Sequence, residues 1–308
     1  MGRIRDFIKF YFRKFLLRLH SEDHKALVLS ANQLIKNILT DTSIKDLRQT
    51  EFRVFSQFGE DGIIQYLIHH LDIPNKIFIE FGVEDYTESN TRFLLINNNW
   101  KGMVLDGSSM NIKFIKNDDI YWRYNLTAIK SFITKENINE SFTTAGITGD
   151  IGILSIDIDG NDYWIWEHID VVSPRIVIAE YNSVLGPDLK VTVPYDPVFV
   201  RRNAHHSNLY FGASIGALCE LAAQKGYYFI GSNSSGNNAF FIRNDVSTPF
   251  KAKSASEGYV KSEFREAMDE SGDLIFTSGD DRIKKISHLK FFDLTSNSII
   301  ELEKLLSK

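Results

Sequence analysis

The stretch of sequence that decides the fold is Ile77-Phe-Ile-Glu-Phe-Gly-Val-Glu-Asp-Tyr-Thr-Glu-Ser-Asn-Thr91. It opens with an apolar run interrupted only by Glu80, passes through Gly82 into polar residues, and continues into a second apolar pattern, Phe93-Leu-Leu-Ile96. A short buried strand, a glycine turn and a helix produce this order, which is the opening of a nucleotide-binding α/β unit. Gly82 lets the backbone approach a ligand closely, and Glu80 places a carboxylate at the carboxyl end of the strand, where such sheets bind ligands.

Further strand–helix units follow this one. The strands that we expect after it are Met103–Gly107, Ile120–Leu126, Asp150–Gly160, Arg175–Asn182 and the hairpin pair Tyr227–Ile230 and Ala239–Ile242. This order predicts an α/β fold with a Rossmann-like, doubly wound, seven-stranded sheet that ends in a C-terminal antiparallel hairpin, with extra helices at the N-terminus.

The composition is that of a globular protein that works in a reducing compartment. The chain has 308 residues, 43% hydrophobic and 24% charged, and a net charge of −5, which argues against a general nucleic-acid binder. Cys219 is its only cysteine, so a disulfide framework and a cysteine zinc site are excluded and a cytoplasmic setting fits. We expect an N-terminal helical region (residues 1–50), a central α/β domain (51–248) and a polar C-terminal extension with a terminal helix (249–308).

Residues 2–20 read GRIRDFIKFYFRKFLLRLH, with basic residues interleaved among apolar residues at three- and four-residue steps. This pattern predicts a basic amphipathic helix. Two interpretations stay open. In the first, the helix docks on the domain or on a partner subunit; docking on a partner subunit would make the protein a homo-oligomer. In the second, residues 1–20 bind an anionic membrane surface, as a peripheral contact at the inner face of the membrane.

Polar side chains stand at the carboxyl ends of the expected strands, where an open α/β sheet forms its crevice. They are Glu80, Asp106, Asn125, Asp157, Asp159, Glu180 and Asn182. Asp106 lies about twenty-four positions after Gly82, near the place where dinucleotide folds keep an acid for ribose hydroxyls. The other interpretation of Asp106 is a turn aspartate before glycine.

The predicted topology and four motifs resemble a known family. The topology is similar to the class I S-adenosylmethionine-dependent methyltransferase fold. The motifs Ser56-Gln-Phe-Gly-Glu-Asp-Gly62, Phe78-Ile-Glu-Phe-Gly82, Leu154-Ser-Ile-Asp-Ile-Asp-Gly160 and Ala179-Glu-Tyr-Asn182 resemble its FkbM-type branch. The resemblance covers roughly residues 52–244 and implies methylation of a hydroxyl on a sugar or sugar-containing metabolite.

If S-adenosylmethionine lies over Gly82, the resemblance implies that Asp106 holds the ribose and that Asn125 meets the adenine. It also implies cofactor-binding roles for the residues Glu80, Asp157, Gln57 and Glu60. Glu60 has a second interpretation, as a residue that starts and caps the helix after Gly59. The cofactor loop departs from the family pattern, because Gly82 is followed by Val83 and Glu84 rather than by further glycines.

Two mechanisms are open for the acceptor hydroxyl. Asp159, Glu180 and Asn182, with Asp157 beside them, offer hard oxygen ligands that suit Mg²⁺, as in metal-dependent O-methyltransferases. In the metal-free alternative Asp159 only turns the chain into the next helix and Asp157 points at the cofactor or acceptor. His205 or His206, from a long irregular segment, is then the candidate general base.

The leading hypothesis is therefore an S-adenosylmethionine-dependent O-methyltransferase acting on a sugar or glycan hydroxyl, in surface-polysaccharide or glycolipid biosynthesis. The alternative is a non-catalytic module of the same fold that binds a nucleotide-sugar or a partner protein, which the glycine-poor loop favours. A carboxylate-rich metal hydrolase is a third hypothesis, ranked below the other two.

Overall fold

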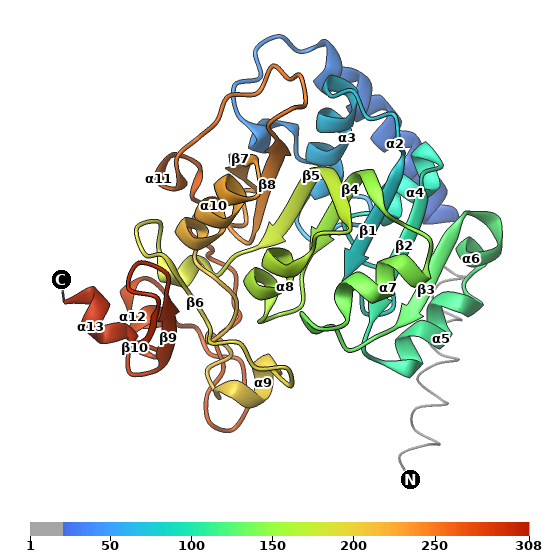
Figure 1. The fold of residues 1–308 in the computed structure, drawn as a ribbon. Helices are drawn as coiled ribbons and strands as arrows, with labels where there is room; N and C mark the ends of the chain where they lie inside the picture. The colour runs from blue at the N-terminus through green and yellow to red at the C-terminus, as the bar shows by residue number, and fades with distance from the viewer. Residues whose placement is uncertain (1–20, 308) are drawn as a thin grey trace.

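The protein is built around one seven-stranded sheet (Figure 1). In sheet order its strands are β3 (Leu126–Lys130), β2 (Lys101–Asp106), β1 (Ile77–Phe81), β4 (Gly149–Ile156), β5 (Val172–Glu180), β8 (Asn238–Arg243) and β7 (Tyr227–Ser232). Strands β3, β2, β1, β4 and β5 are parallel, and β8 runs antiparallel to both of its neighbours. The structure, a computed structural model, describes residues 21–307. The predicted fold class, including the closing hairpin, is confirmed.

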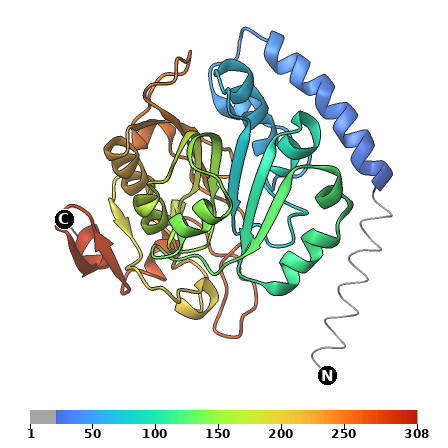
Figure 2. The same cartoon turned by 45° about the vertical axis from the view of Figure 1, so that its right-hand side comes forward.

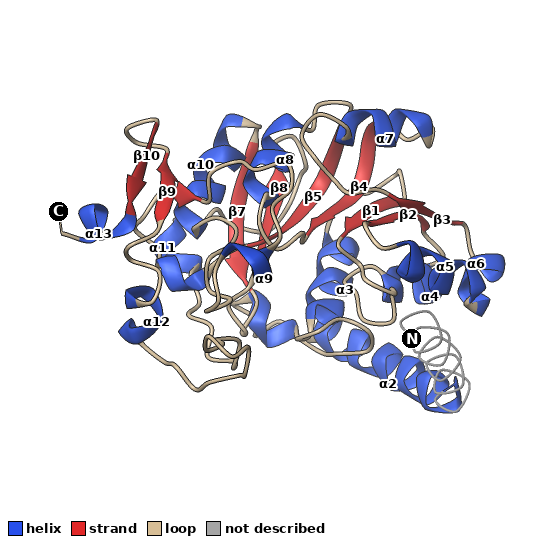
Figure 3. Ribbon diagram, turned by 90° about the horizontal axis from the view of Figure 1, so that it is seen from below, coloured by secondary structure: helices blue, strands red, loops and turns tan. Residues whose placement is uncertain are grey.

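The strands are mainly apolar because both faces of the sheet are covered. Side chains alternate between the faces, so that Phe78 packs into one apolar core and Ile79 into the other. One core holds side chains from α3 (Glu60–His70), α4 (Arg92–Asn98), α5 (Ser109–Asn117) and α6 (Asp119–Arg123). The opposite core holds side chains from α7 (Ile138–Thr144), α8 (Asp162–His168) and α10 (Ile215–Gln224). Figure 3 shows the two helical layers on either side of the sheet.

The predicted third strand, Ile120–Leu126, is wrong. Its first half forms the short helix α6, which begins where the Asp118 side chain accepts the backbone N–H of Ile120 at 3.2 Å. Strand β3 starts only at Leu126, so Asn125 precedes the strand instead of ending it. A short apolar run is compatible with either a strand or a helix, and here the capping aspartate decides for the helix.

A second, smaller sheet joins the irregular segment after β5 to the C-terminal residues. It is antiparallel and consists of β10 (Ser298–Glu301), β9 (Lys290–Asp293) and β6 (Val191–Thr192). A third apolar core lies beside it, where residues 185–209 pack against residues 267–302. The remaining short elements are η1 (Leu47–Thr50), η2 (Ser183–Leu185), α9 (Arg201–Ala204), α11 (Ala255–Gly258), α12 (Asp280–Lys284) and α13 (Leu302–Leu306).

Helix α2 (Ser21–Thr40) lies along the outer surface, on the side away from the small sheet (Figures 1 and 2). Ala31 and Ile35 anchor it, because they pack against Phe55 and Phe93 in a fourth small core. The predicted amphipathic helix of residues 2–20 lies outside the described residues. Within residues 21–307, no helix combines the length and the apolar character that crossing a bilayer requires.

Candidate active site

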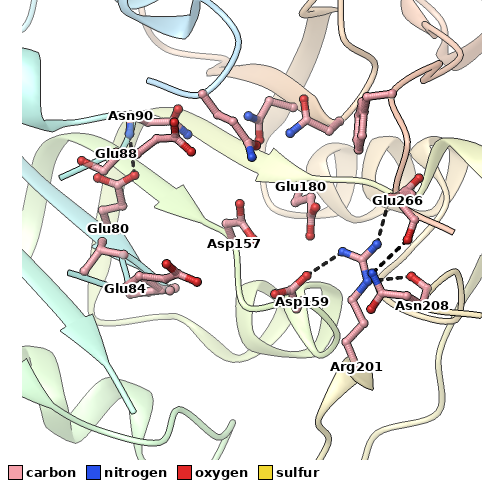
Figure 4. Close-up of a pocket in the computed structure, with 18 of the residues that line it drawn as sticks. Glu80, Glu84, Glu88, Asn90, Asp157, Asp159, Glu180, Arg201, Asn208 and Glu266 are labelled. Carbon is pink, nitrogen blue, oxygen red and sulfur yellow. Dashed lines mark hydrogen bonds and ion pairs between the residues drawn. The ribbon is translucent and has the colours of Figure 1, made fainter. Parts of the chain in front are cut away.

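The site lies at the carboxyl edge of the parallel strands, where β1, β2, β4 and β5 end. A cavity of about 720 Å³ opens there, lined by residues of β1 and β5, by the loop after β1 and by the turn after β4 (Figure 4). A smaller cavity of about 210 Å³ lies at the end of β2. Both are lined by Gly82, Glu84, Asp157 and Asp159. The two cavities therefore adjoin at the loop that follows β1.

The loop after β1 adopts left-handed backbone conformations, which favour glycine, at two non-glycine residues as well as at Gly82. Gly82 has φ +66°, and a Cβ there would lie 1.7 Å from the carbonyl oxygen of Asp157. Glu84 (φ 48°) and Tyr86 (φ 63°) also lie in the left-handed region, at a cost of roughly 1–3 kcal/mol each. The ring of Tyr86 is fully buried, its hydroxyl lies 3.0 Å from Thr91 Oγ1, and it does not line either cavity. The loop thus leaves both cavities open.

Glu80 fixes the far end of this loop. Its buried carboxylate accepts the backbone N–H groups of Asn90 at 2.8 Å and Thr91 at 3.1 Å, and also the Thr91 hydroxyl. Burial raises the pKa of Glu80 to about 7. Glu80 also lines the larger cavity, so it holds the loop and faces the cavity at the same time.

Asp106 ends β2 and lines the smaller cavity, as its predicted position requires. Its Oδ1 accepts the backbone N–H of Ser108 at 2.7 Å and the side-chain amide of Asn111 at 3.0 Å. Burial raises the pKa of Asp106 above its ordinary value. Phe132 and Ile133 add an apolar surface to this cavity.

Asp157, Asp159 and Glu180 form a group that we call the carboxylate triad. One carboxylate oxygen from each lies within 4.8 Å of the others, a spacing that suits a metal ion. Glu180 is 8% exposed, and its Oε2 is buried without a hydrogen-bond partner. Burial, and then the neighbouring carboxylates, raise the pKa values of Asp157 and Glu180 well above the ordinary range. Like charges at this spacing favour protonation or a bound cation.

The turn after β4 is held by Asp162, whose two carboxylate oxygens accept the N–H groups of Ile158 at 2.8 Å and Gly160 at 2.9 Å. Asp159 makes no cap of this kind. Its carboxylate instead pairs with Arg201, with Nη1 2.7 Å from Oδ1 (Figure 4). Asp159 therefore lines the cavity. The side chain that holds the turn is that of Asp162, whereas one interpretation of the sequence assigned this role to Asp159.

Arg201, at the start of α9, is a site residue that the sequence did not single out. Besides Asp159, its guanidinium donates to Glu266 Oε2 at 2.7 Å and to the carbonyl of Asn208 at 2.9 Å. It also lies 3.5 Å above the ring of Phe211. The doublet Arg201-Arg202 in an irregular segment was the only sequence signal, and it did not indicate which arginine faces the site.

The side of the larger cavity opposite the sheet comes from the C-terminal residues. We call the residues Phe264, Arg265, Glu266, Met268 and Leu274, all of which line the cavity, the C-terminal wall. Phe264 stacks on Phe58 with ring centroids 5.0 Å apart. Glu266 receives a second ion pair from Arg282, which also donates to the carbonyl of Ser262 at 2.6 Å. The ion pairs of Glu266 thus tie the C-terminal wall to the rest of the site.

The motif of residues 56–62 forms a loop that borders the cavity. Gln57 lines the larger cavity. Glu60 does not: its Oε1 accepts the side-chain amides of Asn233 at 2.6 Å and Asn238 at 2.8 Å. Because Asn238 lines the cavity, Glu60 acts on it only through this amide. Asp61 organises the loop by accepting three consecutive backbone N–H groups, from residues 54–56.

Three further sequence predictions do not reach either cavity. Asn182 is fully buried and donates to the carbonyls of Leu209 at 2.9 Å and Phe211 at 3.0 Å, while its Oδ1 accepts the N–H of Val184 at 3.1 Å. Its amide therefore supports the backbone instead of acting as a metal ligand. Asn125 is exposed at the amino end of β3, which is the opposite edge of a parallel sheet.

The histidine pair is the third of these. His205 lies 2.8 Å from the Ser207 hydroxyl, and its ring centroid is 4.2 Å from that of His206. Neither histidine lines either cavity, whereas Arg201 and Asn208 of the same segment line the larger one. Burial and the neighbouring cations lower the pKa of His205 below its ordinary value.

No protein-family model and no curated protein matches the chain. Among solved structures, the N-terminal domain of EvdMO1 with SAH bound has 11% identity and a TM-score of 0.35, and the match covers 57% of this chain and 74% of that chain. The O-methyltransferase from Bacillus cereus in complex with SAH has 11% identity, coverages of 70% and 89%, and a TM-score of 0.37. Likenesses of this size carry no argument about activity.

Proposed function

We propose that the protein is an S-adenosylmethionine-dependent O-methyltransferase that acts on a sugar or glycan hydroxyl. The observation that carries the proposal is the meeting of Gly82, Asp106 and the carboxylate triad around two adjoining cavities. The donor needs an adenosyl site and a site for its charged methionine end, and the acceptor must approach the methyl group from the other side.

The smaller cavity suits the adenosyl part of the donor. Asp106 is the acid for the ribose hydroxyls, and Phe132 and Ile133 provide an apolar surface for the adenine ring. The larger cavity suits the methionine end and the acceptor. Its lining near the loop after β1 includes Glu84, whose carboxylate attracts the cationic donor.

The acceptor side of the larger cavity suits a polyhydroxylated molecule. Asn208, Asn237 and Asn238 bring side-chain amides, which both donate and accept hydrogen bonds, and Phe264 brings an aromatic face. These groups match the alternating hydroxyl and C–H surfaces of a sugar ring. They support a sugar acceptor over an apolar one.

Methyl transfer needs a proton acceptor beside the reacting hydroxyl. The hydroxyl oxygen bonds to the methyl carbon, the carbon–sulfur bond breaks, S-adenosylhomocysteine leaves as a neutral thioether, and the hydroxyl proton moves to a base. Asp157 and Glu180 are suited to receive it, because their raised pKa values bring them nearer to that of the group they deprotonate.

The carboxylate triad also fits a divalent metal ion. It offers three hard oxygen donors, and the unpartnered Oε2 of Glu180 is a buried acceptor that an ion would satisfy. A bound Mg²⁺ would supply Lewis acidity that lowers the pKa of the acceptor hydroxyl. Asp157, Asp159 and Glu180 would hold it.

Calorimetry with S-adenosylmethionine and S-adenosylhomocysteine tests the proposal. We expect both to bind the wild-type protein, and Asp106→Ala to weaken binding at least about tenfold, since a lost charged hydrogen bond removes roughly 1.5–3 kcal/mol. Asp170→Ala, which removes an exposed carboxylate just before β5, should bind as the wild type does. If neither compound binds the wild-type protein, the proposal fails and a non-catalytic binding module is left.

The proposal extends to residues 1–20, whose basic and apolar sequence suits an anionic membrane surface that carries lipid-linked acceptors. Co-sedimentation with phosphatidylglycerol vesicles should require these residues. Equal co-sedimentation of the full chain and of residues 21–308 would exclude this role.

A further inference from the structure

Arg201 lies where its guanidinium and a metal ion would compete for the carboxylate of Asp159. It donates to Asp159 of the carboxylate triad, while its other contacts lie outside the triad. We propose that Arg201 is a positioning residue that sets the divalent-ion affinity of the triad: it neutralises Asp159 when no ion is bound and gives that oxygen up when an ion binds. This inference rests on the proposed function and concerns the metal named there.

The contacts of Arg201 allow such an exchange without breaking the site. When Nη1 releases Asp159, the guanidinium keeps Glu266 at 2.7 Å and the Asn208 carbonyl at 2.9 Å, and it keeps its place above Phe211. The arginine side chain is 12% exposed, while that of Asp159 is 58% exposed. The carboxylate is thus the partner that is free to turn, and the arginine is held in place.

Charge explains why an ion would displace the arginine. Arg201 brings one positive charge and contacts one member of the triad, and Glu180 keeps an unpartnered oxygen. A divalent ion brings two charges and reaches one oxygen of each of the three carboxylates, which lie within 4.8 Å of one another. The ion therefore satisfies more of the triad than the guanidinium does, and the arginine sets the affinity by its competition.

Neighbouring arginines do not share this position. Arg265 also lines the cavity, but its guanidinium donates to the carbonyl of Leu274. Arg202, next to Arg201 in α9, is exposed and does not line the cavity. Arg202 is therefore a matched control for the loss of one positive charge from the same helix.

The test is the affinity of the protein for Mn²⁺, measured by calorimetry and by the electron paramagnetic resonance signal of free Mn²⁺. We expect Arg201→Met to bind Mn²⁺ on the order of tenfold more tightly than the wild type, since a competing charge is removed from a partly solvent-screened carboxylate. Arg201→Lys keeps a charge near Asp159 and should stay within about threefold of the wild type. Arg202→Met should not change the affinity.

Each result decides a different point. If the wild type binds Mn²⁺ and Arg201→Met binds it no more tightly, the inference is overturned while the metal site stands. If neither the wild type nor Arg201→Met binds Mn²⁺, the metal part of the proposed function fails together with the inference, whereas S-adenosylhomocysteine binding still tests the methyl donor separately. Should Arg201→Met fail to fold, Arg201→Gln carries the same prediction, because its amide can still donate to the Asn208 carbonyl.

Discussion

The backbone of Gly82 packs directly against the carbonyl oxygen of Asp157, which a Cβ at position 82 would approach to 1.7 Å. This contact joins the loop after β1 to the end of β4 and makes the boundary that the two cavities share. A side chain at this position would have to push the two strand ends apart. Gly82 is therefore required by the site on two grounds, its left-handed φ of +66° and the absence of space.

We predict that Gly82→Ala lowers the free energy of unfolding by roughly 2–4 kcal/mol, since it adds a backbone clash to left-handed strain. Binding of S-adenosylhomocysteine should be lost with it. Chemical denaturation and calorimetry measure the two effects. Gly149→Ala is the matched control: its φ is +73°, but no heavy atom lies within 4 Å of the added Cβ. It should lose only about 1 kcal/mol, from strain alone. Equal losses in the two variants would contradict the role of the contact with Asp157.

Asp61 makes the stability of the fold depend on pH. Burial raises the pKa of its carboxyl to about 6 from the ordinary value of 3.8. The folded protein therefore holds this proton more tightly than the unfolded chain, so that the contribution is fully present below about pH 4 and is lost as the pH rises through about 6. The full change is roughly 3 kcal/mol as an upper value.

Asp61→Asn should remove this part of the pH dependence. Oδ2 of Asp61 accepts all of the hydrogen bonds from residues 54–56, and Oδ1 is unpartnered. In the asparagine variant the amide oxygen can therefore replace Oδ2, and the amide nitrogen can replace Oδ1. Urea unfolding at pH 4 and pH 7 measures the difference between variant and wild type. A difference that is the same at both values would show that Asp61 does not titrate in this range.

The parts of the fold that the sequence predicts are those written in local patterns. The unit from Ile77 to Asn98 has an apolar strand, a glycine and a new helix in one short window, and the parallel order then brings Asp157 and Glu180 to one edge. The predicted strand Ile120–Leu126 fails because a short apolar run does not distinguish a strand from a helix, and Asp118 caps it as a helix.

The part of the site that the sequence did not predict is formed by contacts between residues that are distant in the chain. Arg201 meets Asp159 across 42 positions and Glu266 across 65, and neither pair leaves a spacing that can be recognised in the sequence. For Asn182 the sequence predicted a site residue that the structure does not place in the site. Asn182 follows the end of β5, but its amide donates to the carbonyls of Leu209 and Phe211 and does not face a cavity. Position along a strand predicts the edge of the sheet, and packing decides which way a side chain is used.

Glu180 should limit stability while it supports activity. Burial, and then the neighbouring carboxylates Asp157 and Asp159, raise its pKa well above the ordinary value. The folded protein therefore holds this proton more tightly than the unfolded chain does, and Glu180 costs stability as the pH rises above the ordinary glutamate range. We predict that Glu180→Gln increases the free energy of unfolding, on the order of 1 kcal/mol at pH 8, and that the increase is smaller at pH 5.

The same variant should lower methyl transfer by about a hundredfold or more, which is the usual size of a lost general base. Thermal unfolding at the two pH values and release of S-adenosylhomocysteine in the presence of acceptor measure the two effects. A variant that is less stable at pH 8 than the wild type would mean that Glu180 is compensated by a contact of structural importance.

The C-terminal wall should determine the acceptor and not the donor. Phe264 lines only the larger cavity, where it stacks on Phe58 at 5.0 Å, and the smaller cavity is formed without it. We predict that Phe264→Ala raises the KM for a sugar acceptor roughly tenfold, as expected for the loss of one aromatic contact of about 1–2 kcal/mol. The affinity for S-adenosylhomocysteine, measured by calorimetry, should not change. Phe276→Ala is the control, because Phe276 is 80% exposed and lines neither cavity, so that it should leave both quantities as they are. An equal loss of donor and acceptor binding in Phe264→Ala would instead mean that the wall supports the whole site and does not select the acceptor.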